Sequence, residues 1–394
     1  MKTPYVKTAA VFLFSSFMLS GCWDLKNPQD INYFTAVGFD YVDGQYVVYA
    51  QMIDFLTVAK TEVGSRPEQP IPVWVGHAEG QTAASAFNNL YDTSQFRVFY
   101  GHVNAIIYHD RVLKRNIMPL LDLENRFYEM RYTPWVFGTS EPINELMNIM
   151  SFFNMPPTNN IMHQPQEMLM QKSVIRPVTI REFICELREP ARTVTLPTLG
   201  IDVHNWKQGY GDLDLQPRPF LKIDGIYLFH DGKYRGKLEK NEVLGLRWTD
   251  EETPRSPLLI KSNDKNIALL ALENPKVTIT PVIKDDRVIY KFHVSLKGNV
   301  MELFERWEEQ DLERLAAEKI QSEIRDAYED GLALKADLLQ LEHTLYRKNV
   351  HEWKKLRERE KLELTNESLD IEVEVNLTTS GKLKMMEYNR PKHE

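Results

Sequence analysis

The feature that most constrains the fold is a long helical pattern in the last third of the chain, set between two strand patterns. From Leu303 to Leu345, apolar residues recur at steps of three and four, which is typical of an amphipathic helix. Residues 276–283 and 287–296 before it, and 371–377 after it, alternate apolar and polar side chains as half-exposed strands do. Because such strands need a cover on their apolar face, we expect the helix to pack on the sheet that they form.

A coiled coil is the alternative interpretation of this helix, since its apolar stripe extends over about four heptads. Gly331 would cost about 1 kcal/mol inside a helix. Leu332 and Leu339 also make the stripe wider than the seam of a coiled coil. Both features favour a helix packed on its own sheet. The stripe consists of Ala317, Ile320, Ile324, Ala327, Gly331, Leu334, Leu338, Leu341 and Leu345.

The rest of the chain mixes hairpin and helix signals. Asp43-Gly44 and Asp231-Gly232 each stand between two strand patterns, which predicts a β-hairpin around each pair. Helical spacing predicts helices over residues 82–90, 110–124, 143–152 and 179–187, the second with Asp110 as its N-cap. The chain is therefore expected to be α+β and multi-domain, with mixed and antiparallel sheets, packed helices, and a long helix on the C-terminal sheet.

A domain boundary is expected at residues 204–219, which are poor in apolar residues. An N-terminal α+β region of two subdomains would occupy residues 31–203, and a C-terminal α+β domain residues 220–385, followed by a polar tail at 386–394. The boundary rests on four residues that interrupt regular structure, namely Gly209, Gly211, Pro217 and Pro219.

The N-terminus has the pattern of an export signal. Lys2 and Lys7 precede an apolar run of about a dozen residues, too short for a transmembrane helix, which needs roughly 20. The run ends in Leu19-Ser-Gly-Cys22, which resembles the lipobox of bacterial lipoproteins. That resemblance implies a signal peptide at residues 1–21, lipidation of Cys22, and a lipidated tether at 22–30. Two or more acyl chains would hold such a protein stably on a membrane.

Composition excludes several classes of partner. The chain of 394 residues is 43% hydrophobic and 26% charged, as in ordinary globular proteins. Its net charge is -8, and it becomes -10 without residues 1–21, which hold two lysines and no acidic residue. This argues against a nucleic-acid-binding protein and against attraction to anionic lipid by charge. The other cysteine, Cys185, is expected to be a small core residue.

No catalytic or metal-binding pattern stands out. HExxH, CxxC pairs, GxSxG and a P-loop are all absent from the sequence. His102 and His109 are seven residues apart along a predicted strand, so they would lie on opposite faces, which is wrong for a shared metal. We therefore predict no catalytic residues, no metal site and no cofactor, and hence no enzyme.

Short segments in the same order along the whole chain resemble the Ger(x)C family of spore germination lipoproteins. In the first half they are Cys22-Trp-Asp24, Ala36-Val-Gly-Phe-Asp40 and Arg97–His102, which leads into a strand. In the second half they are the hairpin Gly225–Leu238 followed by Glu242 and Gly245, then Gly298-Asn299, Glu302, Ile320–Asp337, His343, Arg347-Lys348 and Trp353. The family usually has glycines in a helix break near residues 340–343. Here Gln-Leu-Glu-His stands there, so we expect that break to be shorter or absent.

The resemblance implies a three-domain α+β body that serves as the C subunit of a nutrient germinant receptor. The expected partners are a large A-type and a transporter-like B-type integral subunit in the inner membrane of the spore, with this protein lipid-anchored on the outer face. His102 would be structural. A solute-binding lipoprotein of a transporter is the main alternative, although it should show repeated strand–helix units. An exported enzyme such as a cell-wall hydrolase is the second, and no residue supports it.

Overall fold

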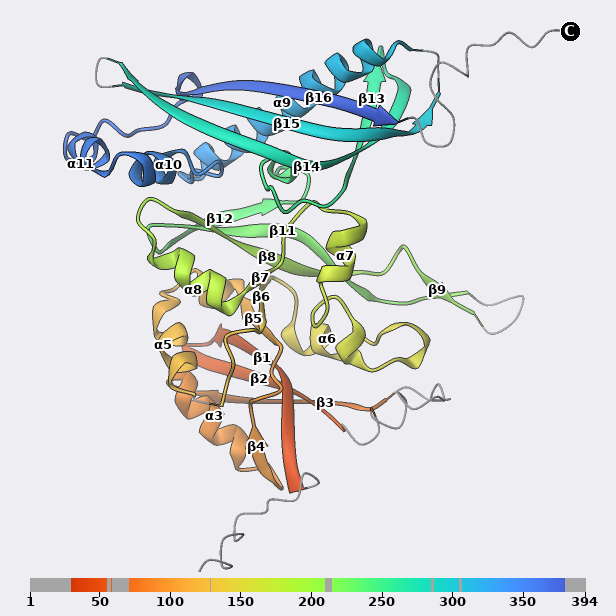
Figure 1. The fold of residues 1–394 in the computed structure, drawn as a ribbon. Coiled ribbons are helices and arrows are strands. Elements are labelled where there is room, and N and C mark those ends of the chain that lie inside the picture. The colour runs from red at the N-terminus through yellow and green to blue at the C-terminus, as the bar shows by residue number, and fades with distance from the viewer. Residues whose placement is uncertain are drawn as a thin grey trace, which may run out of the picture.

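Two stacked sheets organise the protein in the computed structural model (Figure 1), which describes residues 30–54, 58, 71–127, 129–209, 215–284, 287–304 and 307–379. The larger sheet has ten strands in the order β12-β11-β8-β6-β5-β1-β2-β3, with β4 beside β1 and β7 beside β6. Its strands are β1 (Ile31–Val42), β2 (Gln45–Ile53), β3 (Val73–Gly80), β4 (Arg97–Phe99), β5 (Ala105–His109), β6 (Trp135–Thr139), β7 (Val178–Thr179), β8 (Thr193–Asp202), β11 (Phe220–His230) and β12 (Lys233–Glu239). The α+β prediction is confirmed.

Both predicted hairpins of this sheet are present, β1–β2 and β11–β12. Asp43 and Gly44 have φ of 48° and 84°, and Asp231 and Gly232 have φ of 50° and 70°. Positive φ at both central residues is what a two-residue type I′ hairpin requires, and Asp-Gly supplies it at low cost. Local chemistry alone therefore accounts for these two turns.

The centre of the large sheet is buried on both faces. Strand β5 reads Ala-Ile-Ile-Tyr-His with every residue buried, and it runs parallel to β1 and β6. One face packs against α3 (Ala83–Tyr91), α4 (Asp110–Leu113), α5 (Met118–Arg126) and α8 (Ile180–Arg188). The other packs against α6 (Ile143–Asn148) and the segment after it, which contains α7 (Gln166–Gln171). Continuous apolar strands are typical of parallel sheets covered on both sides.

The prediction of one helix over residues 110–124 is wrong in two respects. The structure divides it into α4 and α5, and the N-cap of α4 is His109 rather than Asp110. Pro119 explains the division, because proline lacks an N–H and is tolerated only in the first turn of a helix. It lies in the first turn of α5.

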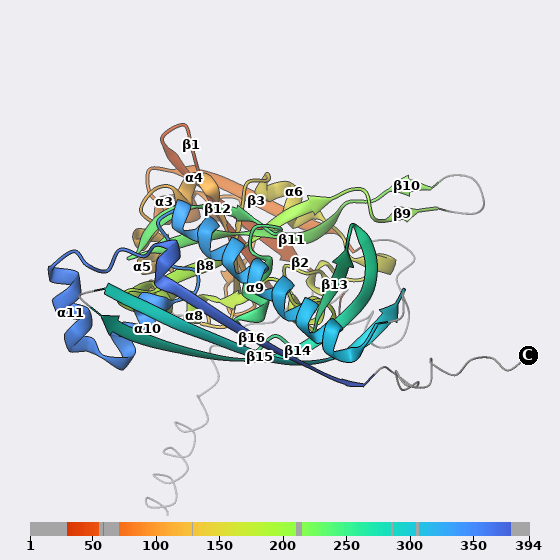
Figure 2. The same ribbon diagram turned by 90° about the horizontal axis from the view of Figure 1, so that it is seen from above.

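The segment 204–219, where a domain boundary is expected, lies between two neighbouring strands of the large sheet. Within it, β9 (Lys207–Gln208) and β10 (Gln216–Pro217) pair as a short ribbon, which we call the arm and which projects from the body (Figures 1 and 2). After the arm, β11 pairs antiparallel with β8, from Phe220 opposite Asp202 to His230 opposite Thr193. The glycines and prolines thus mark an excursion from one sheet, and the chain leaves this sheet only after β12.

The smaller sheet has the order β13-β14-β15-β16 and carries the long helix on one face. Helix α9 (Glu309–Ala333) lies along this sheet in Figure 2 and buries Leu312, Ala316, Ile320, Ile324 and Tyr328. A helix packed on its own sheet is therefore confirmed, although the buried stripe passes through Ala316 rather than Ala317. The strands are β13 (Ser256–Ser262), β14 (Lys265–Lys284), β15 (Arg287–Leu303) and β16 (Leu369–Thr379), the last parallel to β15.

The helix break that we expected to be shorter or absent is present, a few residues earlier than the family position. Helix α9 ends at Ala333, and α10 (Leu341–Lys348) and α11 (Val350–Glu358) follow. Gln340 has a φ of 58°, a left-handed conformation that costs a non-glycine residue roughly 1–2 kcal/mol. Its side chain accepts a hydrogen bond from Thr193 N (3.1 Å) and donates one to Thr193 O (2.6 Å). These bonds offset the strain and fasten the break to the first residue of β8.

Candidate functional site

The two cysteines lie in different situations. Cys22, the predicted lipidation site, lies outside the described residues, and its lipidation stays a prediction. Cys185 is exposed on α8, so the expectation of a core residue is wrong. That helix buries Ile180, Phe183 and Ile184, and residue 185 follows on its outer side because successive side chains turn about 100°.

His102 and His109 lie at opposite ends of the segment that contains β5, and the structure does not bring them together. The His102 ring packs edge-on against Tyr33, with ring centroids 5.0 Å apart. His109 is buried at the end of β5, where its Nδ1 lies 2.9 Å from Asp110 Oδ1 and caps α4. Burial lowers the pKa of His109. Both histidines thus have structural roles.

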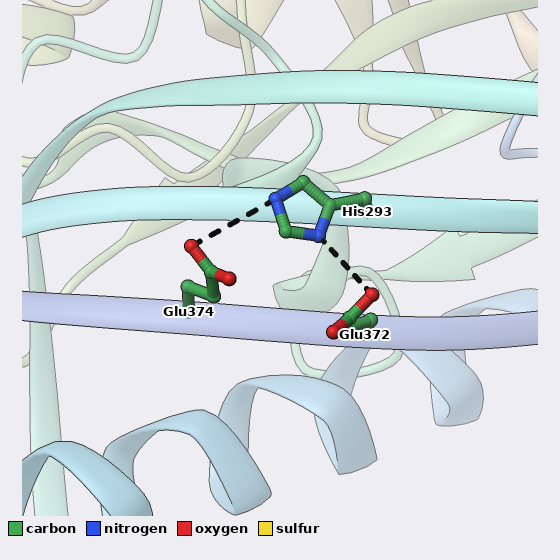
Figure 3. A group of neighbouring side chains, drawn as sticks. All are labelled: His293, Glu372 and Glu374. Atoms are coloured by element: carbon green, nitrogen blue, oxygen red, sulfur yellow. Dashed lines mark ion pairs between the residues drawn. The ribbon is translucent and has the colours of Figure 1, made fainter.

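Three ionisable side chains meet on the open face of the smaller sheet, where the sequence predicted no metal site (Figure 3). His293 lies on β15 and faces Glu372 and Glu374 on β16. Its Nδ1 lies 3.5 Å from Glu372 and its Nε2 lies 4.0 Å from Glu374. One imidazole and two carboxylates are suitable ligands for zinc or manganese. However, the two carboxylates approach opposite nitrogens of one ring, and a single ion can bind only one of these. The arrangement fits cross-strand contacts between the imidazole and the two carboxylates better.

The most distinctive surface feature is an open groove at the base of the arm, with a volume of about 940 Å³. We call it the aromatic groove. The ring of Phe152 stacks on Phe220, with centroids 4.1 Å apart, and meets Trp206 edge-on at 5.0 Å. Phe153 is 69% exposed and Trp206 is 55% exposed. Its main apolar lining residues are Ile149, Met150, Phe152, Phe153, Trp206 and Phe220.

One wall of the groove is formed by the loop that follows α6. Hydrogen bonds to the large sheet and within this loop hold it in place. Gln51 of β2 donates from Nε2 to Met147 O at 2.6 Å. The loop closes on itself where Asn160 Nδ2 donates to Ile149 O at 3.3 Å. His163 then returns to the sheet, with its Nε2 3.0 Å from the Gln51 Oε1. Burial lowers the pKa of His163 to about 3, so this hydrogen bond joins two neutral side chains at physiological pH.

The backbone of the groove wall is strained where it presents an aromatic ring to solvent. Phe153 and Asn154 both have a φ of 58°. Asparagine tolerates this conformation, but for a bulky residue such as phenylalanine it is a genuine outlier. Such strain, together with an exposed aromatic ring, is typical of a functional surface rather than of a loop selected for stability alone.

Sequence reasoning did not find this groove. Residues 204–219 were expected to be a domain boundary, and one wall of the groove lies in this segment. A signal was present in Trp206, which is a large aromatic residue between the polar pairs His204-Asn205 and Lys207-Gln208. The packing of α6 against β8 brings Phe152 to Trp206, and the return of β11 beside β8 adds Phe220.

Two family matches cover most of the chain. Residues 24–201 match the family described as Spore germination protein N-terminal domain, and residues 224–381 match Spore germination B3/GerAC like, C-terminal. The chain therefore belongs to this family of spore germination proteins. The first match begins two residues after Cys22, and the segment between the matches contains the arm.

A similar protein agrees with this assignment, and a solved structure shows a similar fold. The chain is 22% identical over 391 residues to "Spore germination protein KC" of Bacillus subtilis (strain 168), covering 95% of each chain. The fold is similar to that in the crystal structure of the GerBC protein, with a TM-score of 0.52, 13% identity, and coverage of 87% of this chain and 96% of that one. Among the described residues, no helix is both long and apolar enough to cross a bilayer.

Proposed function

We propose that this protein is a lipid-anchored subunit of a nutrient germinant receptor on the outer face of the spore inner membrane. Cys22 carries the lipid, and the folded body contacts the A-type and B-type integral subunits. It is required for the response to nutrients through tethering and protein–protein contact rather than through catalysis.

The observation that supports this proposal most strongly is the pair of family matches, which begin directly after the lipobox-like sequence and continue to residue 381. A membrane-attached germination protein needs a signal, an anchoring cysteine and a folded body in this order. The hairpin-rich C-terminal half also fits a solute-binding lipoprotein poorly, because that class is built from repeated strand–helix units.

The test uses spores in which Cys22→Ala replaces the normal protein, with Cys185→Ala as the matched control. Their optical density is followed after addition of nutrients, and separately after a trigger that bypasses receptors. We expect Cys22→Ala spores to lose the nutrient response, keep the bypass response and lose the protein from the membrane fraction. Cys185→Ala spores should respond normally, because that thiol is exposed and its removal leaves the core intact.

The opposite result would contradict the proposal in a specific way. A normal nutrient response with an unanchored protein would mean that the anchor is dispensable. A normal response of a full deletion, in spores that lack other receptors, would remove the germination role itself.

A further inference from the structure

The aromatic groove exposes apolar surface that the fold does not use. Phe152, Phe153, Val203 and Trp206 are all large, exposed and gathered at the base of the arm. Exposed aromatic patches of this kind mark interaction sites, and tryptophan is among the residues that contribute most to binding energy at protein interfaces. The groove therefore has the composition of the centre of an interface.

The shape of the groove favours a segment of protein over a small molecule or a membrane. Its volume of about 940 Å³ lies at the upper end of small-molecule pockets, and the rings of Phe153 and Trp206 are more than half exposed, so a small ligand would leave these rings partly in water. A bilayer surface is flat, so it would contact the exposed edges of these rings without filling the space between the two walls. Two or three bulky side chains from a helix or an extended segment would fill it.

The charges at its rim indicate the polarity of that segment. Lys207 and Arg218 both line the groove, and within the described residues neither has an ion-pair partner. Glu145 at the other wall is the one acidic side chain among the lining residues. Two cations at the edge of an aromatic groove, on a chain whose net charge is -8, complement an apolar segment with flanking carboxylates.

We propose that the aromatic groove docks a segment of an integral receptor subunit that presents bulky apolar side chains flanked by acidic residues. This inference rests on the proposed function, because it names the surface through which the subunit contacts its membrane partners. Phe153 and Trp206 enter the apolar part of the interface, and Lys207 and Arg218 pair with the carboxylates.

Site-specific crosslinking in the assembled receptor tests the proposal. The full-length lipoprotein is co-expressed with the two integral subunits, each with its own tag, and a photoreactive benzoylphenylalanine replaces Phe153. The matched control carries the same group at Trp74, which is 66% exposed on β3 and lies outside the groove. We expect a light-dependent adduct with an integral subunit from position 153, at least tenfold stronger than from position 74.

Other adducts would overturn the proposal. An adduct with a second copy of this chain would make the groove a self-association surface, and an adduct with lipid would make it a membrane contact. Equal adducts from both positions, or none in a receptor that still co-purifies, would show that the partner docks elsewhere.

Substitutions give a second readout. Phe153→Ser with Trp206→Ser, and separately Lys207→Glu with Arg218→Glu, should each lower the recovered integral subunits at least tenfold, while Trp74→Ser should not. The melting temperature checks that each variant is folded. If deletion of the protein abolishes the nutrient response but these variants germinate and assemble normally, the groove assignment fails and the receptor role stands. If the deletion has no effect, the proposed function itself fails.

Discussion

The two sheets of this protein solve the problem of burying apolar surface in different ways. In the large sheet, central strands such as β5 are apolar at every position and are covered on both faces. In the small sheet, β15 alternates, with Tyr290, Phe292 and Val294 buried against α9, α10 and α11 while Lys291 and His293 face outward. The strand pattern therefore reports how many faces of a sheet are covered.

The largest expected difference between the sheets comes from removing a core side chain. Phe137 is fully buried in the large sheet, and Phe137→Ala should lower the free energy of unfolding by about 3–5 kcal/mol through lost burial and a residual cavity. Ile289→Ala on the outer face of the small sheet should change it by less than about 0.5 kcal/mol. Urea unfolding of full-length protein bearing Cys22→Ala measures both. Similar costs would mean that the open face is covered in solution.

A buried ion pair on α9, the helix that covers the small sheet, gives a second comparison. Glu323 on α9 accepts hydrogen bonds of 2.8 Å from both Arg247 Nη2 and Trp248 Nε1. Glu323→Gln leaves the arginine charge buried without a counter-charge, which should cost about 3–5 kcal/mol. The exposed helix pair Arg314–Glu318 is the control, and Glu318→Gln should have no measurable effect. A tolerated Glu323→Gln would show that water reaches this pair.

The pH dependence of stability should come from the covered side of the large sheet. Burial raises the pKa of Glu124 from 4.5 to about 8, even though Tyr108 donates a hydrogen bond to it. The folded state then holds a proton that the unfolded state releases, so the contribution of Glu124 to stability should fall between about pH 4.5 and 8 by roughly 3–5 kcal/mol. Thermal melting across this range measures the slope.

Two matched substitutions of glutamate by glutamine, one in each sheet region, show which region gives rise to the slope. Glu124→Gln should reduce the slope, so that the variant matches the parent near pH 4.5 and exceeds it near pH 8. Glu372→Gln on the open face should leave the slope unchanged. Some slope should remain in Glu124→Gln, because burial also raises the pKa of Asp337 to about 7. An unchanged slope in Glu124→Gln would exclude Glu124 as its source.

Weakening the contact between the two sheets should lower the free energy of unfolding by less than the core substitutions do. Gln340→Ala removes two hydrogen bonds to Thr193 and should cost about 1–2 kcal/mol. Gln340→Gly removes the same bonds but suits the left-handed backbone, so it should be the milder change. Hydrogen exchange of the α9–α10 break, compared with that of the β8 start, measures this loosening. Glycine as harmful as alanine would mean that the backbone strain is small.

The smallest effect is expected at the open face. His293→Ala should change stability by less than about 0.5 kcal/mol, because exposed ion pairs contribute little. Zinc or manganese should not raise the melting temperature, since the two glutamates face different nitrogens of the ring. A metal-dependent rise that His293→Ala abolishes would contradict this and establish a metal site.

Much of the fold could be predicted because its signals are local. Asp43-Gly44 and Asp231-Gly232 specify their turns through their own backbone preferences, and the stripe of α9 specifies which face is buried. Pro119 also carried a readable signal, because it divides α4 from α5. In each case the physical cause acts within one helical turn or one hairpin.

Other features depend on segments that are distant along the chain. The pairing of β11 with β8, the parallel placement of β16 beside β15 and the contact of Gln340 with Thr193 all depend on how whole faces bury one another. The aromatic groove has the same origin, because Phe152 meets Trp206 through the packing of α6 against β8 and meets Phe220 only when the chain returns to the same sheet. No single residue encodes such pairings, since their stability comes from burial shared among many side chains.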